Sequence, residues 1–235
     1  MTTETKYTFE ESSDDPVTLY YFDIPGKAEG IRYALYYAKI PFVDVRMTRD
    51  DFTKKRNSGE LPYGQVPALR ATNGTLLAQS ASIMRMVGKM SKTMYPEDII
   101  EAAKVDAILD FEVDLFMGVS VSKYSSRFGF GFLDDMPEVR QSVRKVLNDE
   151  ILPKHLSNLE RTIDENVGPW LAGQALPSIA DFTAVPRLIS LVSGNIDGIS
   201  LDLLKGYPKL LKLVDSFYAL DAVKEFQVKS SANTN

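Results

Sequence analysis

The spacing of hydrophobic and polar positions changes along the chain and predicts two domains. In the first ninety residues, short apolar runs of strand length alternate with segments of helical spacing. Strands are predicted over residues 17–22, 41–47, 66–70 and 75–78, and helices over 28–38 and from 80 onward. The charged segment 49–57 fits a short, exposed helix or an irregular turn. The Asn73-Gly74 dipeptide predicts a hairpin between the last two strands, because both residues accept a positive φ. Helical crossovers imply parallel pairing, so we expect a mixed four-stranded sheet covered by helices.

From residue 99 the apolar spacing is helical almost to the end of the chain. Ser178 and Asp181 have the spacing of a capping box, with Asp in place of the usual Glu or Gln. The fold class is therefore α/β followed by all-α. Helices are predicted over 99–128, 137–166 with a bend at Pro153, 179 onward, 201–204, 208–220 and 222–226. The expected parts are a disordered lead 1–16, an α/β domain 17–91, a linker 92–98, a helical domain 99–226 and a loose tail 227–235.

Composition excludes several kinds of chemistry. The chain has no cysteine and one histidine, so disulfides, a thiolate nucleophile and zinc–thiolate sites are not expected. Any thiol chemistry must come from a substrate or a cofactor. A net charge of -5 without a basic run argues against nucleic acid as a partner. No apolar run reaches the length of a membrane span, and the polar N-terminal segment favours a cytoplasmic location.

The segment 17–32 has the pattern of a strand, a tight turn and a helix start, and Tyr21 lies near the end of the strand. A hydroxyl at this position can donate to an anion that a helix N-terminus also attracts. Tyr20 points to the opposite face of the strand. The residues alone leave open that Tyr21 is simply packed in the sheet.

Several motifs occur together in one order along residues 17–226, and they resemble those of the cytosolic glutathione transferases, in particular the sigma class. The resemblance implies a thioredoxin-like domain, a linker and a helical domain. The residues that carry it are Tyr21-Phe22, Gly26-Lys27-Ala28-Glu29 with Ile31-Arg32, Leu61 to Pro67, Gln79-Ser80, Val105 to Ile108 with Asp110 and Asp114, and Ser178 to Phe182.

The resemblance implies that the Tyr21 hydroxyl donates to the sulfur of glutathione and lowers the pKa of its thiol. It also implies a cis bond before Pro67, with main-chain hydrogen bonds from Val66 to the cysteinyl unit. Asp114 would reach across a homodimer interface to the γ-glutamyl amino group of glutathione bound to the other subunit. The expected glutathione-binding residues are Lys27, Phe52, Arg56, Gln65, Val66, Pro67, Gln79, Ser80 and the partner subunit's Asp114.

Other interpretations of these residues stay open. Ser80 is expected to cap a helix as well as bind a carboxylate, and Arg56 fits a solvated helix as well as a ligand contact. Asp110 and Asp114 lie four apart on one helix face, which also suits an acid–base pair. Val113 interrupts the acidic set that holds a divalent metal in some relatives, so no metal is expected.

The sequence therefore predicts a homodimeric glutathione transferase that conjugates glutathione to a small hydrophobic electrophile. One alternative is a glutathione-dependent isomerase or peroxidase acting on a lipid-like substrate. Another is a ligand-binding or structural relative without turnover. The expected second-substrate pocket comprises Phe22, Ile24, Pro25, Met117, Val121 and Tyr124. The apolar residues of this set could instead belong to the hydrophobic core.

Overall fold

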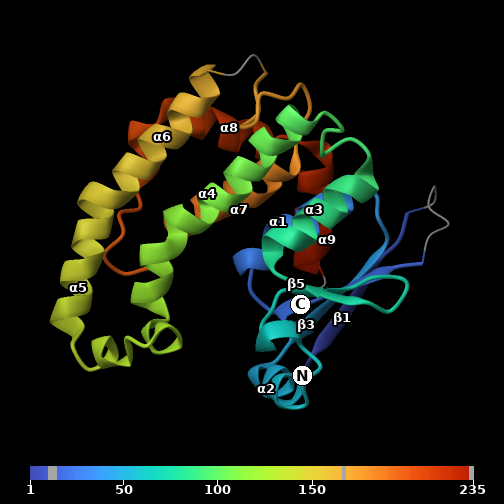
Figure 1. Ribbon diagram of the computed structural model, residues 1–235, viewed down its shortest axis with the longest axis horizontal. Helices are drawn as coiled ribbons and strands as arrows, with labels where there is room; N and C mark the ends of the chain where they lie inside the picture. The colour runs from blue at the N-terminus through green and yellow to red at the C-terminus, as the bar shows by residue number, and fades with distance from the viewer. Residues whose placement is uncertain (10–14, 166–167, 233–235) are drawn as a thin grey trace.

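The computed structural model describes residues 1–9, 15–165 and 168–232, and it contains an α/β domain and a helical domain (Figure 1). The predicted fold class is confirmed. The strands are β1 Thr3–Tyr7, β2 Val17–Phe22, β3 Phe42–Met47, β4 Ala68–Arg70 and β5 Leu76–Ala78. The α-helices are α1 Glu29–Tyr37, α2 Arg49–Asn57, α3 Ser80–Ser91, α4 Ile99–Lys123, α5 Pro137–Val146, α6 Leu152–Glu165, α7 Ile179–Leu191, α8 Pro208–Tyr218 and α9 Asp221–Ala232.

The sheet has five strands, in the order β1-β3-β2-β4-β5, and the prediction of four is wrong. β2 and β3 are parallel, whereas β2 with β4, β4 with β5 and β1 with β3 are antiparallel. The β4–β5 pairing confirms the predicted hairpin. Figure 1 shows α1, α3 and α9 on one side of the sheet and α2 on the other. The sheet is therefore covered on both faces.

The additional strand β1 lies within the lead that was expected to be disordered, and that expectation is wrong for residues 3–7. Tyr7 is the buried residue of this otherwise polar edge strand. Its ring stacks on Phe42 with centroids 4.6 Å apart and lies 5.4 Å from the ring of Phe226 in α9. These tertiary contacts order a segment whose local pattern is polar. Residues 10–14 of the predicted lead lie outside the described residues.

The C-terminal helix also runs further than predicted, because α9 continues through residues 227–232 of the expected loose tail. Lys229 donates to the Tyr36 hydroxyl at 2.7 Å, and Arg46 of β3 donates to the Ser230 hydroxyl at 3.0 Å. Both contacts tie the last turns of α9 to the α/β domain. Residues 233–235 lie outside the described residues.

The predicted helix 137–166 is divided by a π-helical turn at Leu147–Ile151, immediately before Pro153. A proline lacks the N–H that a regular helix would use here, and a wider turn is one way to accommodate that loss. The predicted helix 99–128 ends at Lys123 and is followed by a 3₁₀ turn, Ser125–Phe128. Asn166, the predicted end of the divided helix, lies outside the described residues.

The two domains pack directly against each other through α1 and α7. A Cβ built on Gly30 of α1 would lie 2.0 Å from the carbonyl oxygen of Phe182 in α7, so this close approach requires glycine. The start of α7 is fixed by the predicted capping box: the Ser178 hydroxyl accepts from the Ala180 N–H, and Asp181 accepts from the Ser178 N–H. The elements that border the interface are thus held in place locally. No helix among the described residues is long and apolar enough to cross a membrane.

Candidate functional site

Tyr21 occupies the buried face of β2, where Val17 and Leu19 precede it at alternate positions. Its side chain is 9% exposed. Tyr20 lies on the other face, towards α2, where the ammonium of Lys55 is 5.6 Å from its ring centroid. The period of two therefore separates the two tyrosines as predicted, with only Tyr21 facing α1.

The Tyr21 hydroxyl meets the backbone that leads into α1. It accepts a hydrogen bond from the Lys27 N–H at 3.2 Å. Lys27 belongs to a 3₁₀ turn, η1 Gly26–Ala28, that runs directly into α1. Gly26 has a φ of +47°, and a Cβ built there would lie 2.5 Å from the hydroxyl oxygen. Only glycine lets the turn approach the phenol this closely.

Burial raises the pKa of the Tyr21 phenol above its ordinary value. The Lys27 N–H opposes this rise most strongly, and the charges of Arg187 and Arg32 oppose it further. Because burial dominates, the phenol keeps its proton near neutral pH. With one lone pair engaged by Lys27, the hydroxyl can donate that proton in a hydrogen bond.

Arg32 of α1 holds the loop that follows Tyr21. Its side chain is fully buried, and its Nε donates to both carboxylate oxygens of Asp44 at 3.0 and 3.1 Å. Its terminal nitrogens donate to the carbonyl oxygens of Ile24 at 3.0 Å and Phe22 at 3.3 Å, and to Glu29 at 3.0 Å. A charge that is paired and fully hydrogen-bonded is tolerated in the core. Arg32 thereby fixes the turn between β2 and α1.

The Val66-Pro67 bond is cis, as the resemblance implied, and it directly precedes β4. Gln65 and Val66 are half-buried in the loop before it. Arg56 of α2 lies across the Phe52 ring, with its guanidinium carbon 5.5 Å from the ring centroid. A Cβ built on Gly64 would lie 3.2 Å from the Cγ of Arg56, so α2 and this loop are neighbours. The structure thus brings five of the expected binding residues into neighbouring positions on α2 and this loop.

Gln79 and Ser80 stand at the start of α3, but the expectation that Ser80 caps the helix is wrong. Ser80 is the first helical residue, and Gln79 occupies the cap position with a φ of +71°. No side chain caps this helix. The Ser80 hydroxyl is therefore not used for capping and borders the pocket described next.

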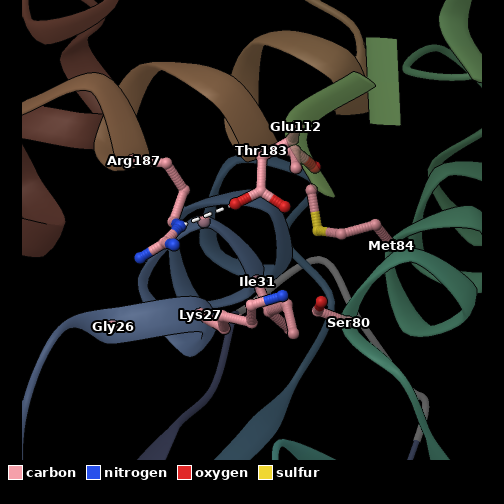
Figure 2. A pocket seen from close by; sticks show the side chains of 9 residues that line it. Gly26, Lys27, Ile31, Ser80, Met84, Glu112, Thr183 and Arg187 are labelled. Carbon is pink, nitrogen blue, oxygen red and sulfur yellow. Dashed lines mark hydrogen bonds and ion pairs between the residues drawn. The ribbon is translucent and has the colours of Figure 1, made fainter. Parts of the chain in front are cut away.

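A small, open pocket lies between the two domains, beside the turn that touches the Tyr21 hydroxyl. Figure 2 shows Lys27 and Ser80 on one side and Glu112 and Arg187 on the other. Nε of Arg187, from α7, donates to Glu112, from α4, at 2.7 Å. The pocket is lined by Gly26, Lys27, Gly30, Ile31, Ser80, Met84, Glu112, Thr183 and Arg187.

Glu112 and Arg187 are the pocket residues that the sequence prediction missed. They lie 75 residues apart, on two helices whose other inward positions are mostly apolar. The signal that could have found them is a charge at the helical spacing of inward apolar residues: Glu112 lies four residues from both Ile108 and Phe116, and Arg187 lies four residues before Leu191. Such a charge needs a partner, but the sequence does not say which one.

The six residues expected to line a second-substrate pocket have different surroundings in the structure. Ile24, Met117 and Tyr124 are 49%, 47% and 51% exposed. Phe22 lies on the opposite face of β2 from Tyr21, with its ring centroid 5.1 Å from that of Phe52. Pro25 is exposed and Val121 is half-buried. The nine residues that line the described pocket include none of these six.

Asp110 and Asp114, both on α4, have different surroundings. Arg85 of α3 donates to Asp110 at 3.0 Å and to Asp106 at 2.6 Å. Asp110 therefore takes part in a salt bridge that joins α3 to α4. Asp114 is exposed on α4. Within the described ranges, no three His, Cys, Asp or Glu side chains gather in a way that could hold a metal ion.

Known proteins resemble this chain over almost its whole length. The family model of the glutathione S-transferase N-terminal domain matches residues 27–90, and that of the C-terminal domain matches residues 125–230. Glutathione S-transferase 1 of Ascaris suum is 30% identical, over 88% of this chain and 93% of its own. Hematopoietic prostaglandin D synthase of Gallus gallus is also 30% identical, over 87% and 92%.

A solved structure agrees with these sequence matches. The crystal structure of the glutathione S-transferase from Ascaris lumbricoides superposes with a TM-score of 0.72 at 28% identity, covering 92% of this chain and 97% of its own. At this coverage the match includes both domains. This chain belongs to the glutathione S-transferase family.

Proposed function

We propose that the protein activates glutathione as a thiolate through the Tyr21 hydroxyl and conjugates it to a small hydrophobic electrophile. One observation carries the proposal. The Tyr21 hydroxyl is buried and accepts the Lys27 N–H at 3.2 Å, at the turn that opens α1. Its proton is then free to point at a sulfur in front of the turn.

Membership of the family supports the coarser part of this proposal. The protein is a glutathione transferase, and glutathione is the co-substrate of the family. The absence of cysteine agrees with a thiol that arrives with the ligand. What the proposal adds is the residue that activates the thiol and the class of compound that receives it.

The hydrogen bond from Tyr21 has a large kinetic consequence. A thiol with a pKa of about 8.5 is only about 3% thiolate at pH 7, whereas one with a pKa of about 6.5 is about 75% thiolate. This shift corresponds to roughly 2.7 kcal/mol. One hydrogen bond to a charged acceptor supplies about 1.5–3 kcal/mol, and the helix start adds partial positive charge. Tyr21 and the start of α1 together are sufficient to lower the thiol pKa by about two units.

The remaining expected residues hold the tripeptide. Main-chain groups of Val66 pair with the cysteinyl unit, and the α3 N-terminus with Ser80 and Gln79 binds the γ-glutamyl carboxylate. Gln65 completes this polar wall, and Phe52 with Arg56 contacts the glycyl end. Lys27 adds positive charge near the sulfur. The neighbouring positions of α2, the loop before β4 and the start of α3 support this assignment.

The electrophile would bind in front of the loop after β2. Exposed apolar side chains on this loop and on α4, among them Ile24, Met117 and Tyr124, support an apolar site. The proposal also includes a cytoplasmic location and a homodimer. In the dimer, the exposed Asp114 of one subunit reaches the γ-glutamyl amino group of glutathione bound to the other.

The test compares Tyr21→Phe with Tyr20→Phe, which removes a hydroxyl from the opposite face of the same strand. We expect kcat/KM for glutathione and a generic aryl halide to fall about a hundredfold in Tyr21→Phe. Its pH profile should move upward by about two pH units, because the thiolate loses its hydrogen bond. Both variants should still bind glutathione, measured by calorimetry. Equal rates in wild type and Tyr21→Phe would remove Tyr21 from the mechanism.

A second candidate is glutathione-dependent isomerisation or peroxide reduction on a lipid-like substrate. The similarity to a protein named hematopoietic prostaglandin D synthase favours it. The same thiolate would serve both reactions. Turnover of a lipid hydroperoxide or endoperoxide well above that of aryl halides, and lost in Tyr21→Phe, would favour this candidate.

A further inference from the structure

We infer that Arg187, held in place by Glu112 and Phe116, stabilises the glutathione thiolate from the helical domain, an inference that rests on the proposed function. The α/β domain contributes the hydroxyl of Tyr21 and the start of α1 to the thiolate. Arg187 lies on α7, on the other side of the pocket (Figure 2). The two domains would therefore act on the same sulfur.

The guanidinium of Arg187 is fixed by two neighbours. Nε donates to Glu112 at 2.7 Å, and the guanidinium carbon lies 3.8 Å from the centroid of the Phe116 ring. The Arg187 side chain is only 14% exposed, and that of Glu112 only 6%. An ion pair with a stacked, planar guanidinium has a defined geometry, unlike a surface lysine. The charge therefore keeps one position at the border of the pocket.

The terminal nitrogens of Arg187 face away from Glu112 (Figure 2). Within the part of the chain that the structure describes, Nε alone of this guanidinium donates a hydrogen bond. The same pocket is bordered by Gly26 and Lys27, and a Cβ on Gly26 would lie 2.5 Å from the Tyr21 hydroxyl oxygen. A sulfur that accepts from Tyr21 beside this turn would lie within the field of Arg187.

The field of Arg187 reaches beyond its own helix. Burial raises the pKa of the Tyr21 phenol, and the charge of Arg187 opposes that rise. For Lys123 on α4, burial and Arg144 lower the pKa most, and Arg187 lowers it further. Both directions agree with positive charge that acts across the space in front of the turn. In a site with little water such a charge is screened less than at the surface.

Other charges around the pocket set the size of the effect. Lys27 of η1 adds to the positive charge, and Glu112 of α4 opposes it. Arg32 and Tyr124 also act on the Tyr21 phenol. Because Glu112 partly cancels Arg187, we expect Arg187 to lower the thiol pKa by about 0.5 to 1.

Two variants that should shift the thiol pKa of bound glutathione in opposite directions test the inference. Arg187→Met should raise the pKa of enzyme-bound glutathione by about 0.5 to 1, whereas Glu112→Gln should lower it by about 0.5. Glu112→Gln keeps an oxygen that accepts from Arg187 and removes only the opposing charge. Arg187→Lys keeps the charge and should restore most of the shift. The pKa is read from the ultraviolet absorbance of the bound thiolate against pH, and glutathione affinity from calorimetry.

The matched control is Arg85→Met, which removes an arginine of α3 that pairs with Asp106 and Asp110 of α4 and lies outside the pocket lining. It should leave the thiol pKa at the wild-type value. An unchanged thiol pKa in a folded Arg187→Met that binds glutathione would overturn the inference. If Arg187→Met does not fold, Glu112→Gln decides, and a thiol pKa at or above wild type overturns it. Failure of the wild type to bind glutathione, or equal rates in Tyr21→Phe, would instead refute the proposed function.

Discussion

Two arginine–carboxylate pairs flank the Tyr21 hydroxyl, one in each domain, and they are built differently. Arg32 is fully buried, and each of its three guanidinium nitrogens donates to the protein, to Asp44, Glu29 and the loop after β2. Among the residues that the structure describes, Arg187 donates a single hydrogen bond, to Glu112, and it lines an open pocket. Both charges lower the pKa of the Tyr21 phenol.

The two arginines therefore have different roles: Arg32 holds the site in shape, whereas Arg187 is placed to act on a ligand. The donors of Arg32 are used within the protein, so this residue shapes the turn and offers nothing to a ligand. Arg187 keeps its terminal nitrogens free of such bonds within the described residues. The sequence motif that contains Arg32 therefore marks a structural arginine, and the arginine that faces the pocket lies outside that motif.

The largest expected effect is on stability, which should fall more when Arg32 is replaced than when Arg187 is replaced. Arg32→Met leaves Asp44 fully buried, with Arg46 at 2.9 Å as its one remaining side-chain partner among the described residues, and should lower the free energy of unfolding by about 3–5 kcal/mol. Arg187→Met should cost less, about 1–3 kcal/mol, because Glu112 borders the pocket, where water can replace the lost hydrogen bond. Urea denaturation followed by circular dichroism measures both. Equal losses would mean that the two pairs do the same structural work.

The next effect tests the turn that Arg32 holds. Gly26→Ala places a methyl group 2.5 Å from the Tyr21 hydroxyl oxygen at a φ of +47°. We expect kcat/KM to fall at least tenfold, together with a stability loss of about 1 kcal/mol. Gly74→Ala is the matched control, because Gly74 has a φ of +84° and nothing within 4 Å of the added Cβ. It should lose similar stability and no activity. A fully active Gly26→Ala would show that the close contact is not needed.

Local pattern was enough to predict most of the elements and the half of the site that lies on them. The period of two places Tyr21 on the buried face of β2, and Asn73-Gly74 forms the hairpin between β4 and β5. The family motifs placed Lys27 and Ser80, and both line the pocket. In each case the determining information lies within a few residues of chain.

The missed features depend on contacts between distant segments. The strand β1 has mostly polar residues and pairs with β3 because Tyr7 packs on Phe42 and Phe226. The partners Glu112 and Arg187 come from two helices, and neither position reveals the other. A charge at an inward position of a helix indicates that a partner exists, but its identity is set by how α4 and α7 pack.

The smallest effect concerns the Tyr21 phenol itself. Burial raises the pKa of this group above that of an unfolded tyrosine, about 10, and Arg187 restrains the rise. Since the folded pKa is the higher one, the stability from this group is present below about pH 10 and is lost as the pH rises through the folded pKa. Arg187→Met should therefore raise the Tyr21 pKa further, and Glu112→Gln should lower it.

The tyrosinate absorbance of each variant, minus that of the same variant carrying Tyr21→Phe, isolates this one phenol among the eleven tyrosines. Arg85→Met should titrate like wild type, because its pair lies outside the pocket. If Arg187→Met also leaves the Tyr21 titration unchanged, the field of Arg187 does not reach the hydroxyl. Arg187 would then join Arg32 as a purely structural residue, and the contrast between the two pairs would reduce to their burial.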